Sequence, residues 1–148
     1  MSAIEQKLAG LGLALPAPRS PVANYLGAKR SGALLLVSGL VSSVRGAVAT
    51  EVTPEAAKRA ARDTMLDLLA LVKREIGDLD LVVSVEHVRG FVRSAPDFMA
   101  QPAIIDGASD LVVALWGEDG RHARTATGVS QLPYGAAVQL EMILRLRD

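Results

Sequence analysis

The chain has 148 residues, of which 50% are hydrophobic and 3% aromatic, and its 16 basic and 16 acidic residues give a formal net charge of zero. A chain of this length buries a sizeable core as one domain over residues 1–148, and the lack of basic excess and stacking aromatics argues against nucleic-acid binding. The absence of cysteine excludes disulfides and thiolate metal sites.

The first predicted element is a short amphipathic helix near residues 3–10. Ser2 and Glu5 have the spacing of a capping box, and Ile4 and Leu8 begin one apolar face. The acidic side chain also interrupts the charge pattern of an export or transit signal. The longest apolar run in the chain has only six residues, too few to cross a bilayer. We therefore expect a cytoplasmic protein without a membrane segment.

A strand pair is predicted next, after a proline-rich stretch that favours extended backbone. The first strand is expected over residues 24–30, with a turn at residues 31–32. The second strand is expected over residues 34–37 and runs into Ser38 and Gly39.

The strongest helix signal begins at Thr53. Thr is a good N-cap, Pro54 suits the first helical position and Glu55 favours the positive end of the helix dipole. Apolar residues then recur at three- and four-residue spacing until Gly77, which predicts the end of the helix.

The second half of the chain predicts strands around one more helix. Residues 81–92 are typical of a long strand, and residues 108–116 of a helix. A strand that includes Arg124 follows. A type I turn is expected at residues 132–135, and an alternating strand over residues 137–143. The last two strands, joined by this turn, are expected to pair.

These elements predict an α+β fold with a single mixed β-sheet and both main helices on one face. Hairpins are expected at both ends of the chain. The other face of the sheet is then left without helical cover. An apolar sheet face in this position predicts a partner, and a homo-oligomer is the simplest one.

Arg124 is the strongest candidate for a functional side chain. The predicted hairpin places it beside the strand that carries Gln139 and Glu141. Its guanidinium is always charged and offers a planar fork of donors that suits a carboxylate or phosphate. A buried guanidinium requires an anion, which is either a protein side chain or a ligand. The residues alone leave both alternatives open.

The two histidines give weaker signals. His122 is two residues from Arg124 on the same predicted strand face, where it either contacts a ligand or is simply solvated or hydrogen-bonded. His87, in the middle of a strand, is interpreted as structural. Neither has the spacing to a second ligand pair that a metal site needs, so no metal is predicted.

Several strings, in this order and spacing, resemble the reactive-intermediate deaminase family, RidA, also called YjgF or endoribonuclease L-PSP. The resemblance extends from about residue 20 to the closing strand. The matching strings are residues 23–25, 37–39, 60–62, 77–80, 98–102, 106–111, 117–124 and 132–133.

The resemblance implies a chorismate-mutase-like topology and a homotrimer with active sites between subunits. It also implies that Arg124 clamps the carboxylate of an enamine or imine such as 2-aminoacrylate. Water would add to the imine carbon and ammonia would leave, giving a 2-oxo acid without metal or organic cofactor. Tyr25, Ser38 and Gly39 would line the cleft, and Asp106 would lie at its rim.

The chain departs from the family pattern at two positions. Gln139 occupies the place of a glutamate that often holds the attacking water, and an amide cannot take a proton from water at neutral pH. Glu141 lies on the same strand face about 7 Å away, where it is a substitute base or an interface residue. Leu40 replaces a polar residue that commonly follows Ser-Gly.

Three alternatives to this function stay open. The first is a deaminase for a different imine, such as an aminomuconate-like compound. The second is a non-catalytic protein that binds a small carboxylate such as a 2-oxo acid and serves in regulation. The third is the ribonuclease activity attributed to some relatives, against which the zero net charge and the few aromatics count.

Overall fold

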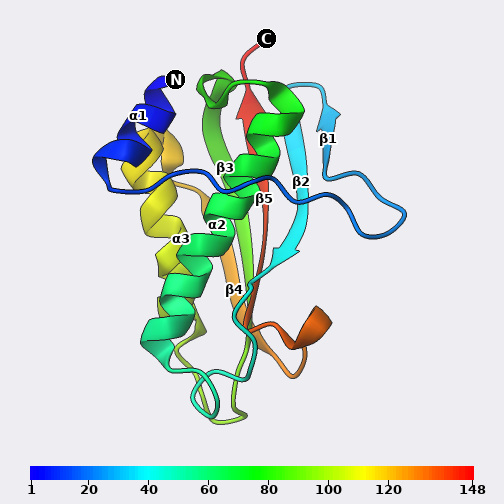
Figure 1. Ribbon diagram of the computed structural model, residues 1–148, viewed down its shortest axis with the longest axis vertical. Helices are drawn as coiled ribbons and strands as arrows, with labels where there is room; N and C mark the ends of the chain where they lie inside the picture. The colour runs from blue at the N-terminus through cyan, green and yellow to red at the C-terminus, as the bar shows by residue number, and fades with distance from the viewer.

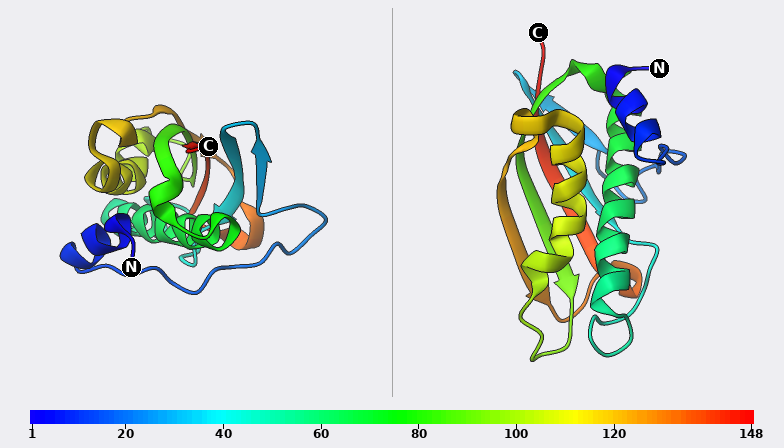
Figure 2. Two further views of the ribbon diagram at one scale, coloured as in Figure 1. Left: turned by 90° about the horizontal axis from the view of Figure 1, so that it is seen from above. Right: turned by 90° about the vertical axis from the view of Figure 1, so that its left-hand side faces the viewer.

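A computed structural model describes residues 1–148. Five strands form one mixed sheet in the order β1-β2-β5-β3-β4, and Figures 1 and 2 show the helices gathered on one face of it. The predicted α+β class is confirmed. The elements are α1 (Ala3–Gly10), β1 (Ala28–Ser31), β2 (Leu34–Val41), α2 (Pro54–Ile76), β3 (Val82–Arg93), α3 (Gln101–Trp116), β4 (Ala123–Val129) and β5 (Val138–Leu146), with short 3₁₀ turns η1 (Leu79–Leu81), η2 (Gly117–Gly120) and η3 (Pro133–Gly135).

The core lies between the sheet and the helices α2 and α3. Side chains of β5, the middle strand of the sheet, alternate between its two faces. Leu140, Met142 and Leu144 are buried under the helices. Gln139 and Glu141 face the other way. No helix combines the length and the apolar character that a bilayer crossing demands.

Helix α2 begins and ends where its capping residues predict. The Thr53 side chain accepts a hydrogen bond from the Ala56 backbone N–H at 3.2 Å, and Pro54 occupies the first turn. Gly77 ends the helix in the left-handed region, with a φ of 90°.

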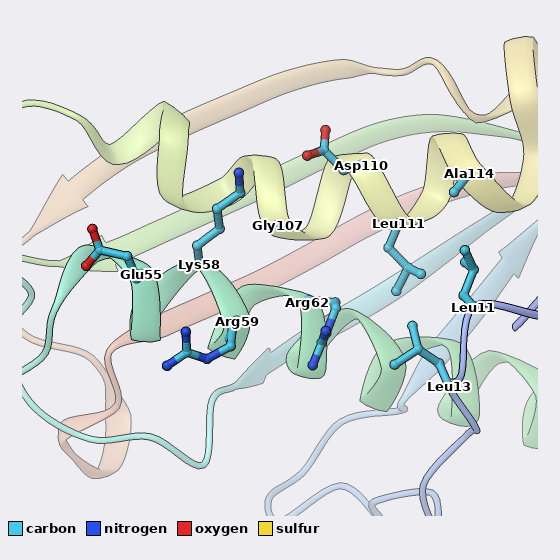
Figure 3. Close-up of a pocket in the computed structure, with 10 residues that line it drawn as sticks. All are labelled: Leu11, Leu13, Glu55, Lys58, Arg59, Arg62, Gly107, Asp110, Leu111 and Ala114. Atoms are coloured by element: carbon cyan, nitrogen blue, oxygen red, sulfur yellow. The ribbon is translucent and has the colours of Figure 1, made fainter.

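Helix α3 begins seven residues earlier than predicted, at Gln101 rather than Ala108. Pro102 costs no hydrogen bond because it lies in the first helical turn. Gly107 is required in the helix interior because a Cβ there would lie 2.1 Å from the Lys58 carbonyl oxygen of α2. The two helices cross at this glycine (Figure 3).

The predicted C-terminal hairpin is wrong. Strand β4 pairs in parallel with β3, and β5 pairs antiparallel with β3 and β2, so β3 lies between β4 and β5. The parallel pair arises because the chain crosses over through α3 between β3 and β4. The N-terminal hairpin of β1 and β2 is confirmed, although β1 starts at Ala28 rather than at residue 24.

The sheet face without helices is mixed in character rather than uniformly apolar. Two ion pairs cross it, Arg89 with Glu141 at 3.7 Å and Arg145 with Glu86 at 3.5 Å. Leu36 and Val83 are exposed apolar side chains of β2 and β3. The expectation of an apolar face is therefore met only in part.

Helix α1 is fixed to the rest of the domain by the carboxylate of Asp80. Its two oxygens accept the backbone N–H groups of Ala3 at 2.8 Å and Ile4 at 3.1 Å. These two bonds lower the pKa of Asp80. The stability that the carboxylate contributes is therefore present above the ordinary aspartate pKa of about 3.9 and is lost as the pH falls through the lower folded value.

Replacing Asp80 with alanine is expected to cost about 1 kcal/mol of unfolding free energy, as does the loss of other N-terminal capping groups. The amides of α1 should lose hydrogen-exchange protection first. The measurement is denaturant unfolding at pH 7 with exchange of the α1 amides. Asp119→Ala, at an exposed residue without an ion pair, is the control. Unchanged protection of α1 in Asp80→Ala would contradict this account.

Candidate functional site

Arg124 projects from β4 toward α3, on the helix-covered side of the sheet. Its Nη1 donates to Asp106 Oδ1 at 2.6 Å and to Ser109 Oγ at 3.2 Å, and its Nη2 donates to the Pro102 carbonyl at 3.3 Å. The side chain is 24% exposed, and that of Asp106 is 46% exposed. Within one chain, the anion that Arg124 requires is thus a protein carboxylate.

The guanidinium is not fully used by these contacts. It carries five N–H groups, and the three hydrogen bonds leave one N–H on Nε and one on Nη2 without a protein acceptor. These two nitrogens form the side edge of the guanidinium, which binds a carboxylate through two parallel bonds. Arg124 therefore retains the donors for an anionic ligand.

His122 joins the same cluster through Ser109. The histidine Nε2 lies 2.9 Å from Ser109 Oγ, and Nδ1 lies 2.7 Å from the Gly120 carbonyl oxygen. Burial lowers the pKa of His122, the positive charge of Arg124 adds to this effect, and the hydrogen bond to Gly120 opposes it. Of the two predicted roles, the structure supports the hydrogen-bonded one.

A second cluster forms a pocket of about 300 Å³ at the other side of the molecule. It gathers three of the predicted site residues. Tyr25 comes from residues 11–27 between α1 and β1 (the N-terminal arm), Gly39 from β2 and Gln139 from β5. Figure 1 shows this arm crossing α2 between α1 and β1. The remaining lining residues are Arg19, Ser20, Val22, Leu40, Val41, Pro133 and Tyr134.

A β-bulge shapes the floor of this pocket. The register of β2 on β5 shifts between Val37 and Leu40, so that Ser38 and Gly39 form the irregular step. A Cβ on Gly39 would lie 3.2 Å from Gln139 Nε2, so a larger residue here would press on the Gln139 side chain. The Ser38 hydroxyl donates to the Leu26 carbonyl at 2.5 Å and so holds the arm.

Arg19 and Tyr134 border the pocket, and neither was predicted. The Arg19 guanidinium bonds to Asp67 and, at 2.7 Å, to the Val41 carbonyl, so its charge is already engaged. Tyr134 has a φ of 60°, the left-handed conformation of the third residue in a type II turn, which excludes the predicted type I turn. A bulky residue in this conformation is strained by about 1–3 kcal/mol, and such strain is common beside binding sites.

The two clusters do not meet within one chain. Arg124 is opposite Val88 of β3 and faces the helices, whereas Gln139 is opposite Phe91 and faces the open side of the sheet. Two strand spacings alone separate β4 from β5 by about 10 Å. Glu141 does not line the pocket and pairs with Arg89. The predicted proximity of Arg124 to Gln139 and Glu141 is therefore wrong.

Comparison with known proteins gives the family. The family model described as "YjgF/chorismate mutase-like, putative endoribonuclease" matches residues 5–143. The chain belongs to this family. Protein TCP17 of Trypanosoma cruzi, a relative, is 37% identical over 152 residues, which cover 98% of this chain and 95% of that protein.

Two solved structures share the whole fold of this YjgF-family chain. A protein of unknown function from Agrobacterium tumefaciens is 39% identical, with a TM-score of 0.91 over 98% of this chain and 93% of its own. A protein from Shewanella oneidensis, described as a putative endoribonuclease, is 25% identical, with a TM-score of 0.93 over 97% of this chain and 99% of its own.

Sequence reasoning missed Ser109 in this YjgF-family protein, although a signal was present. Asp106 and Ser109 are three residues apart and share one face of α3, toward β4. The predicted start of the helix at residue 108 separated them. Because α3 begins at Gln101, Asp106 and Ser109 both lie on the helix face toward β4, where a contact with Arg124 is expected.

A further groove, of about 550 Å³, lies elsewhere, between α2, α3 and the N-terminal arm. Figure 3 shows that the cations in it, Lys58, Arg59 and Arg62, diverge rather than converge on one point. Glu55 and Asp110 add opposite charges. This groove gathers no set of side chains suited to one ligand.

Proposed function

We propose that this protein hydrolyses 2-imino acids, and the enamines that tautomerise to them, to 2-oxo acids and ammonia. 2-Aminoacrylate represents the substrate class. The observation that carries the proposal is the guanidinium of Arg124, which is held on one side by Asp106 and Ser109 and keeps N–H groups on Nε and Nη2 for a carboxylate. The RidA resemblance supplies the reaction.

The proposed site takes Arg124 from one copy of the chain and Tyr25, Gly39 and Gln139 from another. Its support is the separation of the two clusters, since neither is complete alone. A head-to-tail contact brings different surfaces of identical chains together and closes into a ring. A homotrimer is the ring that the resemblance implies.

The chemistry needs orientation more than reactive side chains. Two hydrogen bonds to Arg124 would fix the substrate carboxylate and so place the imine carbon against a water held by Gln139. The water oxygen bonds to that carbon, and the C=N π electrons move to nitrogen, which takes the water's proton. The hydroxyl proton of this intermediate then moves to the amino nitrogen, the C–N bond breaks as the C=O bond forms, and ammonia leaves.

Binding of a 2-oxo acid without turnover is the second candidate function. The Gln139 amide favours it because an amide holds a water molecule but accepts no proton from it. The Asp106 carboxylate lies 2.6 Å from Arg124 and offsets its charge, so a 2-oxo acid is expected to bind only weakly. An aminomuconate-like imine is a further substrate candidate, since Leu40 lines the pocket.

The test is ammonia release from 2-iminopropionate, generated in situ by an amino-acid oxidase. The wild type should accelerate release, and Arg124→Met should reduce kcat/KM by at least about 10- to 100-fold, because it removes two charge-assisted hydrogen bonds to the carboxylate and one alone is worth that much. Arg121→Met, at an exposed arginine three residues earlier, is the matched control and should match the wild type.

Absence of acceleration by the wild type would overturn the deaminase proposal for this substrate. Calorimetric titration with 2-oxobutyrate then tests the second candidate, binding without turnover. Saturable binding by the wild type that is lost in Arg124→Met would establish a carboxylate-binding protein without turnover.

A further inference from the structure

We propose that Ser109 and His122 are positioning residues for Arg124, which hold its guanidinium in the orientation that presents Nε and Nη2 to a carboxylate. The inference rests on the proposed carboxylate clamp. It deepens that proposal by assigning a role to two residues on α3 and before β4 that do not touch the ligand.

The hydrogen bonds of this cluster have one consistent direction. The Gly120 carbonyl can only accept, so His122 Nδ1 carries a proton and donates to it at 2.7 Å. In the neutral ring Nε2 is then the acceptor, and the Ser109 hydroxyl donates to it at 2.9 Å. The lone pairs of Ser109 Oγ are left for Arg124 Nη1, at 3.2 Å.

This direction matters because it fixes a hydroxyl group that otherwise rotates. A serine whose proton is committed to His122 presents only acceptor lone pairs to the guanidinium. Asp106 alone would hold Nη1 by one bond and leave the guanidinium plane less defined. With Ser109 as the second acceptor, both Nη1 protons are fixed.

The electrical surroundings keep His122 neutral. Burial is the main effect that disfavours a proton on the ring, and the positive charge of Arg124 on β4 acts in the same direction. Asp106 is the one acidic side chain in the cluster, and it is paired with Arg124. A protonated His122 would donate from Nε2 and reverse the Ser109 hydroxyl, so the arrangement belongs to the neutral ring.

The test compares the wild type with Ser109→Ala, His122→Phe and His122→Gln, the last of which keeps an acceptor for the Ser109 hydroxyl. Thr64→Val, which removes a buried hydroxyl elsewhere in the helical layer, is the control. Ser109→Ala and His122→Phe should weaken 2-oxobutyrate binding by about 2- to 10-fold, the value of one hydrogen bond. His122→Gln should retain most of the affinity, and Thr64→Val all of it.

Nuclear magnetic resonance without ligand separates this inference from the proposed function. The His122 ring should be neutral at pH 7, with the proton on Nδ1. The Nη signals of Arg124 should report slow rotation of the guanidinium that becomes faster in Ser109→Ala. Wild-type affinity and rotation in Ser109→Ala, or a proton on Nε2, would overturn the inference. If the wild type neither accelerated imine hydrolysis nor bound a 2-oxo acid, the proposed function would fail, and the resonance data would still decide whether Ser109 and His122 hold Arg124.

Discussion

Replacing Gln139 with glutamate is expected to accelerate imine hydrolysis by about 10²- to 10⁴-fold, the range that general base catalysis supplies. The amide at this position can orient the attacking water but cannot remove its proton. A carboxylate of nearly the same shape does both. The gain should therefore appear in kcat, with little change in KM, because the proposed carboxylate clamp, Arg124, is unchanged.

The surroundings of Gln139 favour this substitution. The side chain is partly exposed at the pocket, beside Gly39, so the change introduces no buried unpaired charge. The measurement is ammonia release as a function of pH. The variant should lose activity at acid pH as the new carboxylate is protonated, a dependence that the wild type lacks at this residue.

Glu141→Gln is the matched control, because it changes the charge on the same strand face. Activity that survives in Glu141→Gln would show that Glu141 is not the base. A wild type that loses its activity in Glu141→Gln, together with an unchanged rate in Gln139→Glu, would assign the base to Glu141 instead. In that case, the water-holding role of Gln139 would be wrong.

Replacing Gly107 with alanine is expected to destabilise the domain by about 3 kcal/mol or more, the upper range for overpacked cores. The new Cβ would lie 2.1 Å from the Lys58 carbonyl oxygen, a backbone atom that cannot turn aside. The helices α2 and α3 would have to separate. The better helix propensity of alanine returns only about 1 kcal/mol.

Thermal and denaturant unfolding of the two proteins measure this effect. Gly10→Ala is the matched control, because Gly10 is also helical and a Cβ added there would meet nothing within 4 Å. That variant should be neutral or stabilised by about 0.5–1 kcal/mol. A Gly107→Ala protein as stable as the wild type would show that the helix pair can separate without cost, contrary to the packing described above.

Local signals in the sequence predicted the local parts of the fold. Thr53, Pro54 and Gly77 define α2 because capping chemistry acts within one turn of the helix. The start of α3 was missed because Pro102 and Gly107 resemble helix breakers. Their helical positions depend on the first turn and on contact with Lys58, and neither is apparent from residue type alone.

Strand pairing required information that the sequence pattern does not contain. The Pro-Tyr-Gly segment at residues 133–135 correctly indicates a turn, but a turn does not determine which strands become neighbours. Strand β3, about forty residues earlier in the chain, inserts between β4 and β5. The prediction therefore named Arg124, Gln139 and Glu141 as individual candidates and misplaced Arg124 relative to the other two.

The opposite faces of Arg124 and Gln139 have a consequence for how activity and folding relate. Any reaction that needs both side chains at one centre must be performed by more than one copy of the chain. Catalytic competence then requires assembly as well as folding, so it depends on protein concentration. A substitution at the contact between copies would therefore silence the chemistry even where each chain still folds, and it would lower the melting temperature only by what assembly contributes.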